Sequence, residues 1–169
     1  MKKIFIVSAT RKTNYILAKK LEEILLTLDI EVTVISLEDY ELPLYTDDIY
    51  QNKKDEYFDV VESLTKQFSD HKGLIICGPE YNGSTPPIIP NSIAWISVST
   101  DYWKDAFRDK VFLIASSSGG PGTKFIATMK LQLEHLGSII VPESISANDR
   151  APLKEESAKK ILKQFINLI

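Results

Sequence analysis

The loop at residues 8–14, SATRKTN, gathers hydroxyl side chains between an apolar run and a segment with helical spacing. Ser8, Thr10 and Thr13 can donate hydrogen bonds, as can the free backbone N–H groups of a helix start. Several donors converging on one anion at the positive end of a helix dipole are what a phosphate monoester needs, and Arg11 can add charge. The pattern therefore predicts a phosphate site. It is equally compatible with Thr10 or Thr13 acting only as the helix cap.

A second loop, GPEYNGSTPP at residues 78–87, ends another apolar run. Its first proline lacks a backbone donor, whereas Asn82 and Gly83 tolerate left-handed geometry, so the N–H groups from Tyr81 to Ser84 can turn into a crevice. Directed amides beside an aromatic side chain suit a flat heterocycle with carbonyl and ring-nitrogen acceptors. The same residues also fit an ordinary strand-to-helix turn, in which the two later prolines start the next helix.

Familiar catalytic and binding signatures are missing. The absence of GxGxxG argues against the usual dinucleotide fingerprint, and the absence of GxxxxGK[ST] argues against a nucleoside triphosphatase. No Ser/His/Asp triad or acid pair is evident. Cys77 is the single cysteine, which excludes an intrachain disulfide and a CxxC metal site, and a buried position is expected for it. We therefore expect no catalytic side chain and no metal ligand.

Strand and helix patterns alternate five times. Short apolar runs predict strands at 4–7, 31–37, 73–77, 110–115 and 138–141, and helical spacing predicts helices at 16–28, 57–68, 91–98, 125–136 and 154–168. The acidic stretch after the second strand is expected to be irregular. Right-handed crossovers of this kind build a five-stranded parallel sheet covered on both faces, a doubly wound α/β fold. In the flavodoxin-like order 2-1-3-4-5, a crevice opens between the first and third strands, where both loops lie.

The composition fits one globular domain over residues 1–169, with 44% hydrophobic and 25% charged residues. The formal net charge of -3 gives no overall attraction for nucleic acid or anionic lipid, so any bound anion must be held by local geometry. The first apolar run is too short for a signal peptide, and no apolar stretch approaches a membrane span. We expect no nucleic-acid partner, no membrane partner and a cytoplasmic location.

Most of the chain resembles the NAD(P)H-dependent FMN reductase family of flavodoxin-like flavoproteins, which includes chromate, azo and quinone reductases. The segment GPEYNGSTPPIIPNSIAWIS, residues 78–97, is close to that family's Pro-Glu-Tyr-Asn-Gly-Ser loop and the Asn- and Trp-containing helix that follows. The segment DKVFLIASSSGGPGTKFIATMKLQLEHLG, residues 109–137, is similar to its fourth strand, Ser-Gly-Gly loop and next helix. Pro90 and Ala94 depart from the Lys and Asp that the family often has, and Pro90 is expected to delay or distort the helix start.

The resemblance implies an FMN site. The phosphate would be held by Ser8, Thr10, Arg11 and Thr13. The flavin would be lined by Pro79, Glu80, Tyr81, Asn82 and Gly83, the backbone amides of the last three reaching ring acceptors. Its other edge would lie along Ser117, Gly119 and Gly120. NADPH or NADH would supply hydride, and a quinone, azo compound, metal oxyanion or free flavin would accept the electrons. The resemblance also implies a homodimer or homotetramer.

Two other functions remain open. One is a single-electron carrier of the flavodoxin type without NAD(P)H activity, which the hydroxyl-rich first loop permits. The other is a flavin-free α/β binding module, because a fold does not fix a function. Candidate partners for the 2′-phosphate of NADPH are Arg11, Lys12 and Arg108. Candidate subunit contacts are Trp95, Tyr102 and Trp103.

Overall fold

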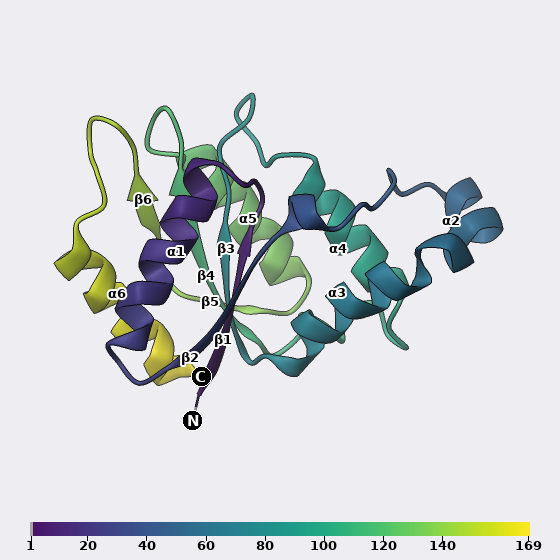
Figure 1. The fold of residues 1–169 in the computed structure, drawn as a ribbon, viewed down its shortest axis with the longest axis horizontal. Coiled ribbons are helices and arrows are strands. Elements are labelled where there is room, and N and C mark those ends of the chain that lie inside the picture. The colour runs from purple at the N-terminus through teal and green to yellow at the C-terminus, as the bar shows by residue number, and fades with distance from the viewer. Residues whose placement is uncertain (1) are drawn as a thin grey trace.

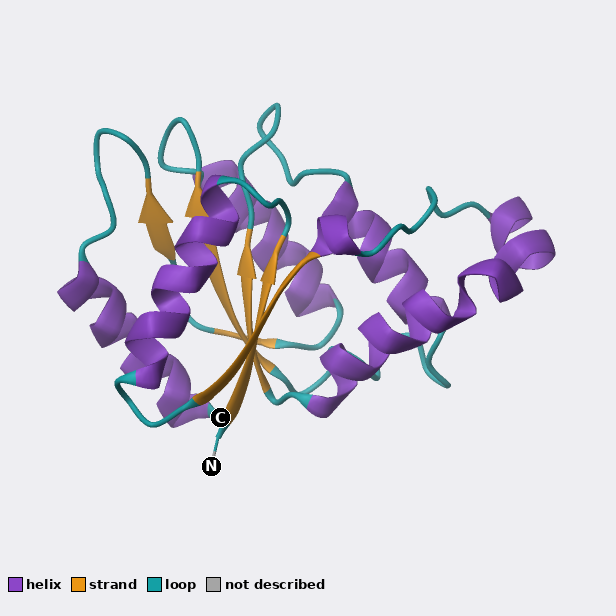
Figure 2. Ribbon diagram, viewed as in Figure 1, coloured by secondary structure: helices purple, strands orange, loops and turns teal. Residues whose placement is uncertain are grey.

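Runs of branched apolar residues form a parallel sheet in the computed structural model, which describes residues 2–169. The strands are β1 Lys3–Ser8, β2 Glu31–Ser36, β3 Gly73–Cys77, β4 Val111–Ser117, β5 Ile139–Ile140 and β6 Ile145–Ala147. Their order is β2-β1-β3-β4-β5, with β6 also paired to β4 (Figures 1 and 2). The predicted flavodoxin-like fold and strand order are confirmed. The order reverses between β1 and β3, so the loops after these two strands diverge there.

The fifth position of the sheet is split into two short strands, which the sequence pattern did not reveal. β5 pairs with the start of β4 through Val111 and Phe112, and β6 pairs with its end through residues 115–117. Pro142, which has no backbone donor, lies between the two pieces. The β6 segment therefore extends the sheet beside the loop that follows β4.

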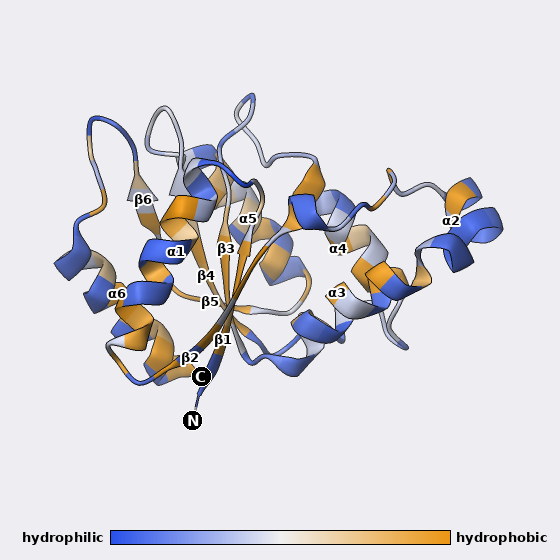
Figure 3. Cartoon of the chain, viewed as in Figure 1, coloured by the Kyte–Doolittle hydropathy of each residue, from blue (hydrophilic) through white to orange (hydrophobic). Residues whose placement is uncertain are grey.

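Helices cover both faces of the sheet. They are α1 Thr13–Leu26, α2 Asp47–Lys53, α3 Phe58–Asp70, α4 Ile88–Val98, α5 Thr123–His135 and α6 Glu155–Leu168. One apolar cluster joins α1 and α6 to the sheet and a second joins α3, α4 and α5 to its other face. Figure 3 shows apolar strands in the middle and hydrophilic residues on the outer helix surfaces. Within residues 2–169, no helix is long and apolar enough to cross a membrane.

Two local predictions were wrong. The acidic stretch after β2 contains α2, because the Thr46 hydroxyl accepts a hydrogen bond from the Ile49 amide and caps a helix with acids in its first turn. Pro90 neither delays nor distorts α4, which begins at Ile88. Pro90 falls in the first helical turn, where a backbone N–H has no partner within the helix, so the missing donor costs no helical hydrogen bond.

The Asn and Trp of α4 anchor the segment that leads to α2. Asn91 donates to the Pro43 carbonyl at 2.9 Å and accepts from the Tyr45 amide at 2.7 Å. Trp95, one turn later, donates through Nε1 to the same Pro43 carbonyl at 2.9 Å and is 1% exposed. Trp95 is therefore a core residue and not the predicted subunit contact, whereas Tyr102 and Trp103 are exposed.

Lys110 is a buried cation at the edge of the sheet where the strands begin. It is 3% exposed, and its Nζ donates to the carbonyls of Ser69 and His71 at 2.7 Å each. Burial lowers the pKa of Lys110 from 10.5 to about 8; Lys72 adds to this shift and Asp70 opposes it. Between these two pH values the folded chain binds fewer protons than the unfolded chain.

We expect stability to rise with pH in this window, because unfolding then requires proton uptake. In urea unfolding, the wild type should gain about 1 to 2 kcal/mol over Lys110→Met between pH 7.5 and 9.5, since one pKa unit corresponds to about 1.4 kcal/mol. Lys163→Met, which alters an exposed lysine of α6, is the control and should show no such gain. A pH-independent difference for Lys110→Met would contradict the lowered pKa.

Candidate functional site

The loop between β1 and α1 leaves the start of α1 without a side-chain cap. Lys12 occupies the N-cap position and its side chain makes no capping hydrogen bond. The Ser8 hydroxyl, which is buried, donates to the Thr10 carbonyl at 2.7 Å and so shapes the turn. The structure shows no threonine cap at this helix, so the first amides of α1 remain available to an anion.

Arg11 points away from this helix start and binds two acids that follow β2. Its backbone N–H donates to Glu38 Oε2 at 2.6 Å, and its Nε donates to Asp39 Oδ1 at 2.6 Å. A second guanidinium nitrogen binds the same Asp39 oxygen. The hydrogen bond to Asp39 raises the pKa of Arg11. Both the amide and the charge of Arg11 are therefore engaged outside the crevice.

The loop after β3 turns tightly at Asn82 and Gly83. Their φ values are 50° and 74°, which confirms the predicted left-handed geometry and explains why glycine suits the second position. The Tyr81 amide donates to the Ser84 carbonyl at 3.0 Å, and the Ser84 amide donates back at 2.9 Å. For Tyr81 and Ser84, the prediction that the amides turn into the crevice is therefore wrong, because the turn itself uses both amides.

Glu80 ties this loop to α5 and to the loop after β4. Its backbone N–H donates to Ser118 Oγ at 2.8 Å. Its carboxylate accepts a hydrogen bond from the Lys124 amide at 3.0 Å, close to the start of α5, where the helix dipole favours negative charge. The Glu80 side chain is thus committed to α5, although its residue borders the crevice.

Two serine hydroxyls and one backbone carbonyl extend the link between the loop after β3 and the loop after β4. Ser116 Oγ donates to the Gly78 carbonyl at 2.8 Å and lies 2.9 Å from Ser118 Oγ. Since the Ser116 proton is used, Ser118 donates to Ser116 while accepting from the Glu80 amide. The ends of the two strands are thereby held together by a directed chain of hydrogen bonds.

Asn14 fastens the first loop to the end of β4. Its Nδ2 donates to the Ser117 carbonyl and its Oδ1 accepts from the Ser117 amide, both at 2.8 Å. Asn14 is 1% exposed and Ser117 is partly buried, so both hydrogen bonds are shielded from most of the solvent. The loops after β1 and β4 are therefore fixed relative to each other.

These loops enclose a cavity of about 450 Å³, which we call the switch-point pocket. Its lining residues come from α1, from the loops after β1, β3 and β4 and from the segment after β6; these loops gather at the edge of the sheet where the strands end (Figure 1). It is lined by Thr10, Lys12, Thr13, Asn14, Ile16, Leu17, Lys20, Pro79, Glu80, Tyr81, Ser117, Ser118, Gly119, Ala147, Asn148, Asp149, Pro152 and Leu153.

The pocket brings together seven of the predicted cofactor residues from three loops: Thr10, Thr13, Pro79, Glu80, Tyr81, Ser117 and Gly119. The other five do not line it in the described part of the chain: Ser8, Arg11, Asn82, Gly83 and Gly120. Ser8 lies beneath the loop, and Arg11 faces the acids after β2. The pocket wall also includes Lys12, which the sequence offered as a partner for a 2′-phosphate, and Lys20, which it did not.

The sequence analysis missed several residues of this site. The sequence did contain a signal for Asn14. It lies three positions before Leu17 and seven before Leu21, and this spacing places it on the buried face of the helix. Lys20 falls on the same side of α1 as Thr13, seven positions earlier. The wall from 147 to 153 had no local signal. Within residues 2–169, no group of three or more His, Cys, Asp or Glu side chains could hold a metal ion.

A family profile described as NADPH-dependent FMN reductase matches residues 1–152. An uncharacterized protein of Mycoplasma pneumoniae is 29% identical over 149 residues, which cover 82% of this chain and 84% of that protein. A quinone reductase of Escherichia coli strain K12 is 35% identical over 80 residues, 47% of this chain and 40% of that enzyme. The chain thus aligns with less than half the length of the quinone reductase.

Solved structures share the fold along nearly the whole chain. A flavoenzyme NAD(P)H:(acceptor) oxidoreductase from Paracoccus denitrificans has a TM-score of 0.75 at 20% identity, covering 99% of this chain and 95% of that one. An oxidoreductase from Corynebacterium diphtheriae has a TM-score of 0.80 at 14% identity, with coverages of 100% and 97%. A flavodoxin from the domain Archaea has a TM-score of 0.65 at 10% identity, covering 98% of both chains. At these identities the likeness concerns the fold alone.

Removing the Asn14 amide should loosen the pocket walls. We expect Asn14→Ala to lower the free energy of unfolding by about 1 to 2 kcal/mol, because it removes the hydrogen bonds to the partly buried amide and carbonyl of Ser117. Urea unfolding measures this change. Asn52→Ala is the matched control, since the exposed Asn52 side chain donates to Asp48 on the helix surface, and it should cost less than about 0.5 kcal/mol. Equal losses in the two variants would contradict the role given to Asn14.

Proposed function

The chain belongs to the NADPH-dependent FMN reductase family, and on this basis we propose that it uses FMN to take hydride from NADPH or NADH and to reduce a small acceptor. The observation that carries the proposal is the switch-point pocket. An uncapped helix start with two hydroxyls, the segment from Pro79 to Tyr81 and the small residues of the loop after β4 face one cavity there. This combination suits a phosphate at one end and a flat ring at the other.

The pocket residues fit FMN in distinct ways. We propose that Thr10, Thr13 and the first amides of α1 hold the phosphate. Pro79 and Tyr81 would flank the ring on one side, and Gly119 on the other, because a Cβ built on Gly119 meets no atom within 4 Å. Asn14 and Ser118 would support the walls through their hydrogen bonds without touching the reacting atoms.

The chemistry of hydride and electron transfer would be that of the bound flavin. The chain would bind, orient and partly shield the reactants. Tyr81 is 48% exposed at the rim of the pocket, where its ring can contact a flat donor or acceptor. No side chain of this pocket is needed as a general acid or base. Cys77 takes no part, since it is fully buried and burial raises its pKa well above the ordinary range.

We further propose that residues 1–169 act as one FMN-binding domain in the cytoplasm. A quinone is the first acceptor to assay, because relatives named quinone reductase and 2-hydroxy-1,4-benzoquinone reductase match parts of the chain. Azo compounds, metal oxyanions and free flavin belong to the same assay, since each needs only access to the reduced ring.

A spectrum of the purified protein after addition of FMN and removal of the excess tests the proposal. Bound flavin bands that bleach on anaerobic addition of NADPH or NADH are the expected result. Bound flavin that neither nucleotide bleaches would indicate an electron carrier instead. Absence of bound flavin would indicate a flavin-free binding module and would overturn the proposal.

Filling the pocket should block the cofactor. Gly119 borders the pocket and Gly120 does not, and a Cβ at either glycine meets no atom within 4 Å. We expect Gly119→Phe to raise the dissociation constant for FMN at least tenfold, and Gly120→Phe to raise it much less, as measured by flavin fluorescence titration. Circular dichroism checks that both variants fold. Equal effects of the two substitutions would place the flavin elsewhere.

A homodimer or homotetramer is also part of the proposal. Its support is a second cavity, of about 760 Å³, between α3, α4 and the segment around α2. Its lining is mixed: the apolar side chains of Phe58 and Val98 lie among polar and charged ones, and Phe58 is 58% exposed. An exposed aromatic side chain surrounded by polar residues is typical of protein–protein contacts.

Size-exclusion chromatography with light scattering tests this arrangement. We expect Phe58→Glu to shift the protein to the monomer, because a carboxylate would then be buried in an apolar contact. Leu131→Glu alters a similarly exposed apolar side chain on α5 and should leave the oligomer intact. Dissociation by Leu131→Glu alone would move the interface to α5, and a monomeric wild type would contradict the proposal.

A further inference from the structure

The cavity of about 760 Å³ beside α3, which we call the α3–α4 cavity, has the volume of a small-molecule site. α3 and α4 cover the face of the sheet that α1 does not. The α3 wall is one stripe of side chains at helical spacing, about three turns long: Phe58, Val61, Glu62, Thr65, Lys66 and Ser69. The opposite wall is formed by the end of α4 and the loop after it: Trp95, Val98, Ser99, Thr100, Asp101 and Asp105.

One buried hydroxyl in the α3 wall has no partner. Thr65 is 8% exposed, and its Oγ1 forms no hydrogen bond within residues 2–169. A threonine inside a helix can donate to a carbonyl of the preceding turn, and Thr65 does not. A buried hydroxyl without a partner costs free energy. Because Thr65 lines the cavity, a ligand there can supply the missing hydrogen bond.

Carboxylates outnumber cations in the lining of the α3–α4 cavity. Lys66 pairs at 2.6 Å with Asp70, which lies outside the lining. In the described part of the chain, three of the lining acids form no ion pair: Asp55, Glu62 and Asp101. A cleft with an excess of one sign of charge attracts ligands of the other sign, so this cavity favours a cation.

Aromatic rings make the same cavity suitable for ammonium groups. Tyr50, Phe58 and Trp95 contribute to its lining. Lys54 Nζ lies 5.5 Å from the centroid of the Tyr50 ring, within the range of a cation–π contact. The ammonium group of Lys54 thus marks one position that a cation can occupy, and it would compete with a ligand for that position.

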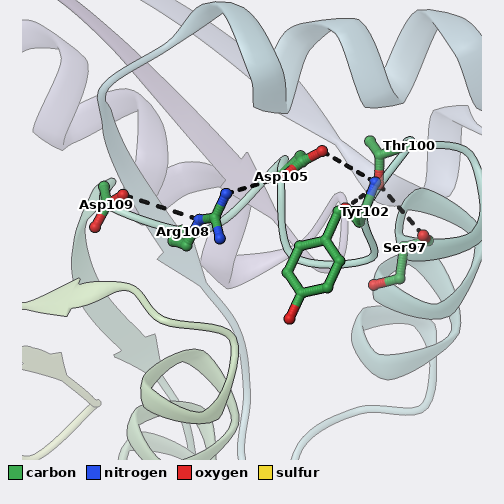
Figure 4. A network of polar contacts seen from close by, with 6 residues as sticks. All are labelled: Ser97, Thr100, Tyr102, Asp105, Arg108 and Asp109. Atoms are coloured by element: carbon green, nitrogen blue, oxygen red, sulfur yellow. Dashed lines mark hydrogen bonds and ion pairs between the residues drawn. The ribbon is translucent and has the colours of Figure 1, made fainter.

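The loop that carries Asp101 is held by its own hydrogen bonds (Figure 4). Thr100 Oγ1 donates to the Tyr102 carbonyl at 2.9 Å, and the Tyr102 amide donates to Asp105 Oδ2 at 3.0 Å. Arg108 lies 3.4 Å from the other oxygen of Asp105. Asp105 is therefore committed to the loop, whereas Asp101 is not. Within residues 2–169, these acids form no group of three or more that could hold a metal ion, which favours an organic cation.

We propose that the α3–α4 cavity binds an elongated organic polycation of the polyamine class. Glu62 and Asp101 pair with its ammonium groups, Val98 contacts its methylene chain, and Thr65 Oγ1 accepts a hydrogen bond from one ammonium group. The inference goes beyond the proposed function, because this cavity shares no residue with the switch-point pocket. The oligomer contact proposed above concerns the exposed Phe58, two turns of α3 away from Thr65.

Isothermal titration calorimetry with spermidine tests the site without an activity assay. Triethylene glycol is the matched probe, since it is a neutral chain of the same length. We expect spermidine to bind and triethylene glycol to show no measurable binding, and the affinity for spermidine to fall with added salt because charges dominate the contact. Spermidine binding that is absent, or no tighter than that of triethylene glycol, would overturn the inference whether or not the protein binds FMN.

Charge variants locate the site on the protein. We expect Glu62→Gln and Asp101→Asn each to weaken spermidine binding about threefold, the size expected for exposed ion pairs. Lys54→Met should tighten it about twofold, because it removes the competing ammonium group. Asp59→Asn is the matched control, since Asp59 is an exposed acid of α3 outside the lining. An effect of Asp59→Asn as large as that of Glu62→Gln would show only general attraction to an acidic surface and would refute the site.

Thr65→Val removes the hydroxyl and keeps the shape of the side chain. We expect it to weaken spermidine binding about threefold, as for the loss of one hydrogen bond to a charged group. The urea midpoint of the ligand-free variant should not fall, because no hydrogen bond within the protein is lost. A lower midpoint together with unchanged spermidine affinity would give Thr65 a purely structural role and would contradict the inference.

Discussion

The paired hydrogen bonds between Asn14 and Ser117 are the contact on which the pocket depends. The strand order reverses between β1 and β3, so the loops above them diverge. In the sheet β3 separates β1 from β4, so no ladder joins the ends of β1 and β4 directly, and a side chain supplies that connection. Asn14 does so from inside the protein, joining residues that are 103 positions apart in the chain. An amide is suited to this task because it offers a donor and an acceptor at the same time.

The serines and Glu80 extend this connection to the other side of the crevice. The Ser118 hydroxyl accepts a hydrogen bond from the Glu80 amide and donates one to Ser116, which in turn donates to the Gly78 carbonyl. The loops after β3 and β4 are therefore fixed by their own polar groups before any ligand arrives. Preorganisation of this kind lowers the entropic cost of holding a cofactor. These hydrogen bonds lie in the walls of the pocket, so they make the loops rigid without filling the space between them.

Charge is distributed so that the helix start stays open to an anion. Glu38 and Asp39 hold Arg11 outside the pocket. The Glu80 carboxylate accepts a hydrogen bond from the Lys124 amide at the start of α5. Lys12 and Lys20 remain on the α1 wall. The pocket lining also includes Glu80 and Asp149, so the groups offered to an anion at the helix start are its uncapped amides and the threonine hydroxyls.

The sequence by itself determined the fold and the three loops that form the pocket. Its apolar periodicity and turn residues are local signals: branched runs gave the strands, and Asn82 with Gly83 gave a left-handed turn. It missed α2, whose cap lies in an acidic stretch, and the division of the sheet edge into β5 and β6, which pairing with β4 defines. Only the tertiary structure decided which side chains face the pocket. Arg11 and Lys20 carry the same charge in the sequence, and the partners that distant elements bring to Arg11 are what separate them.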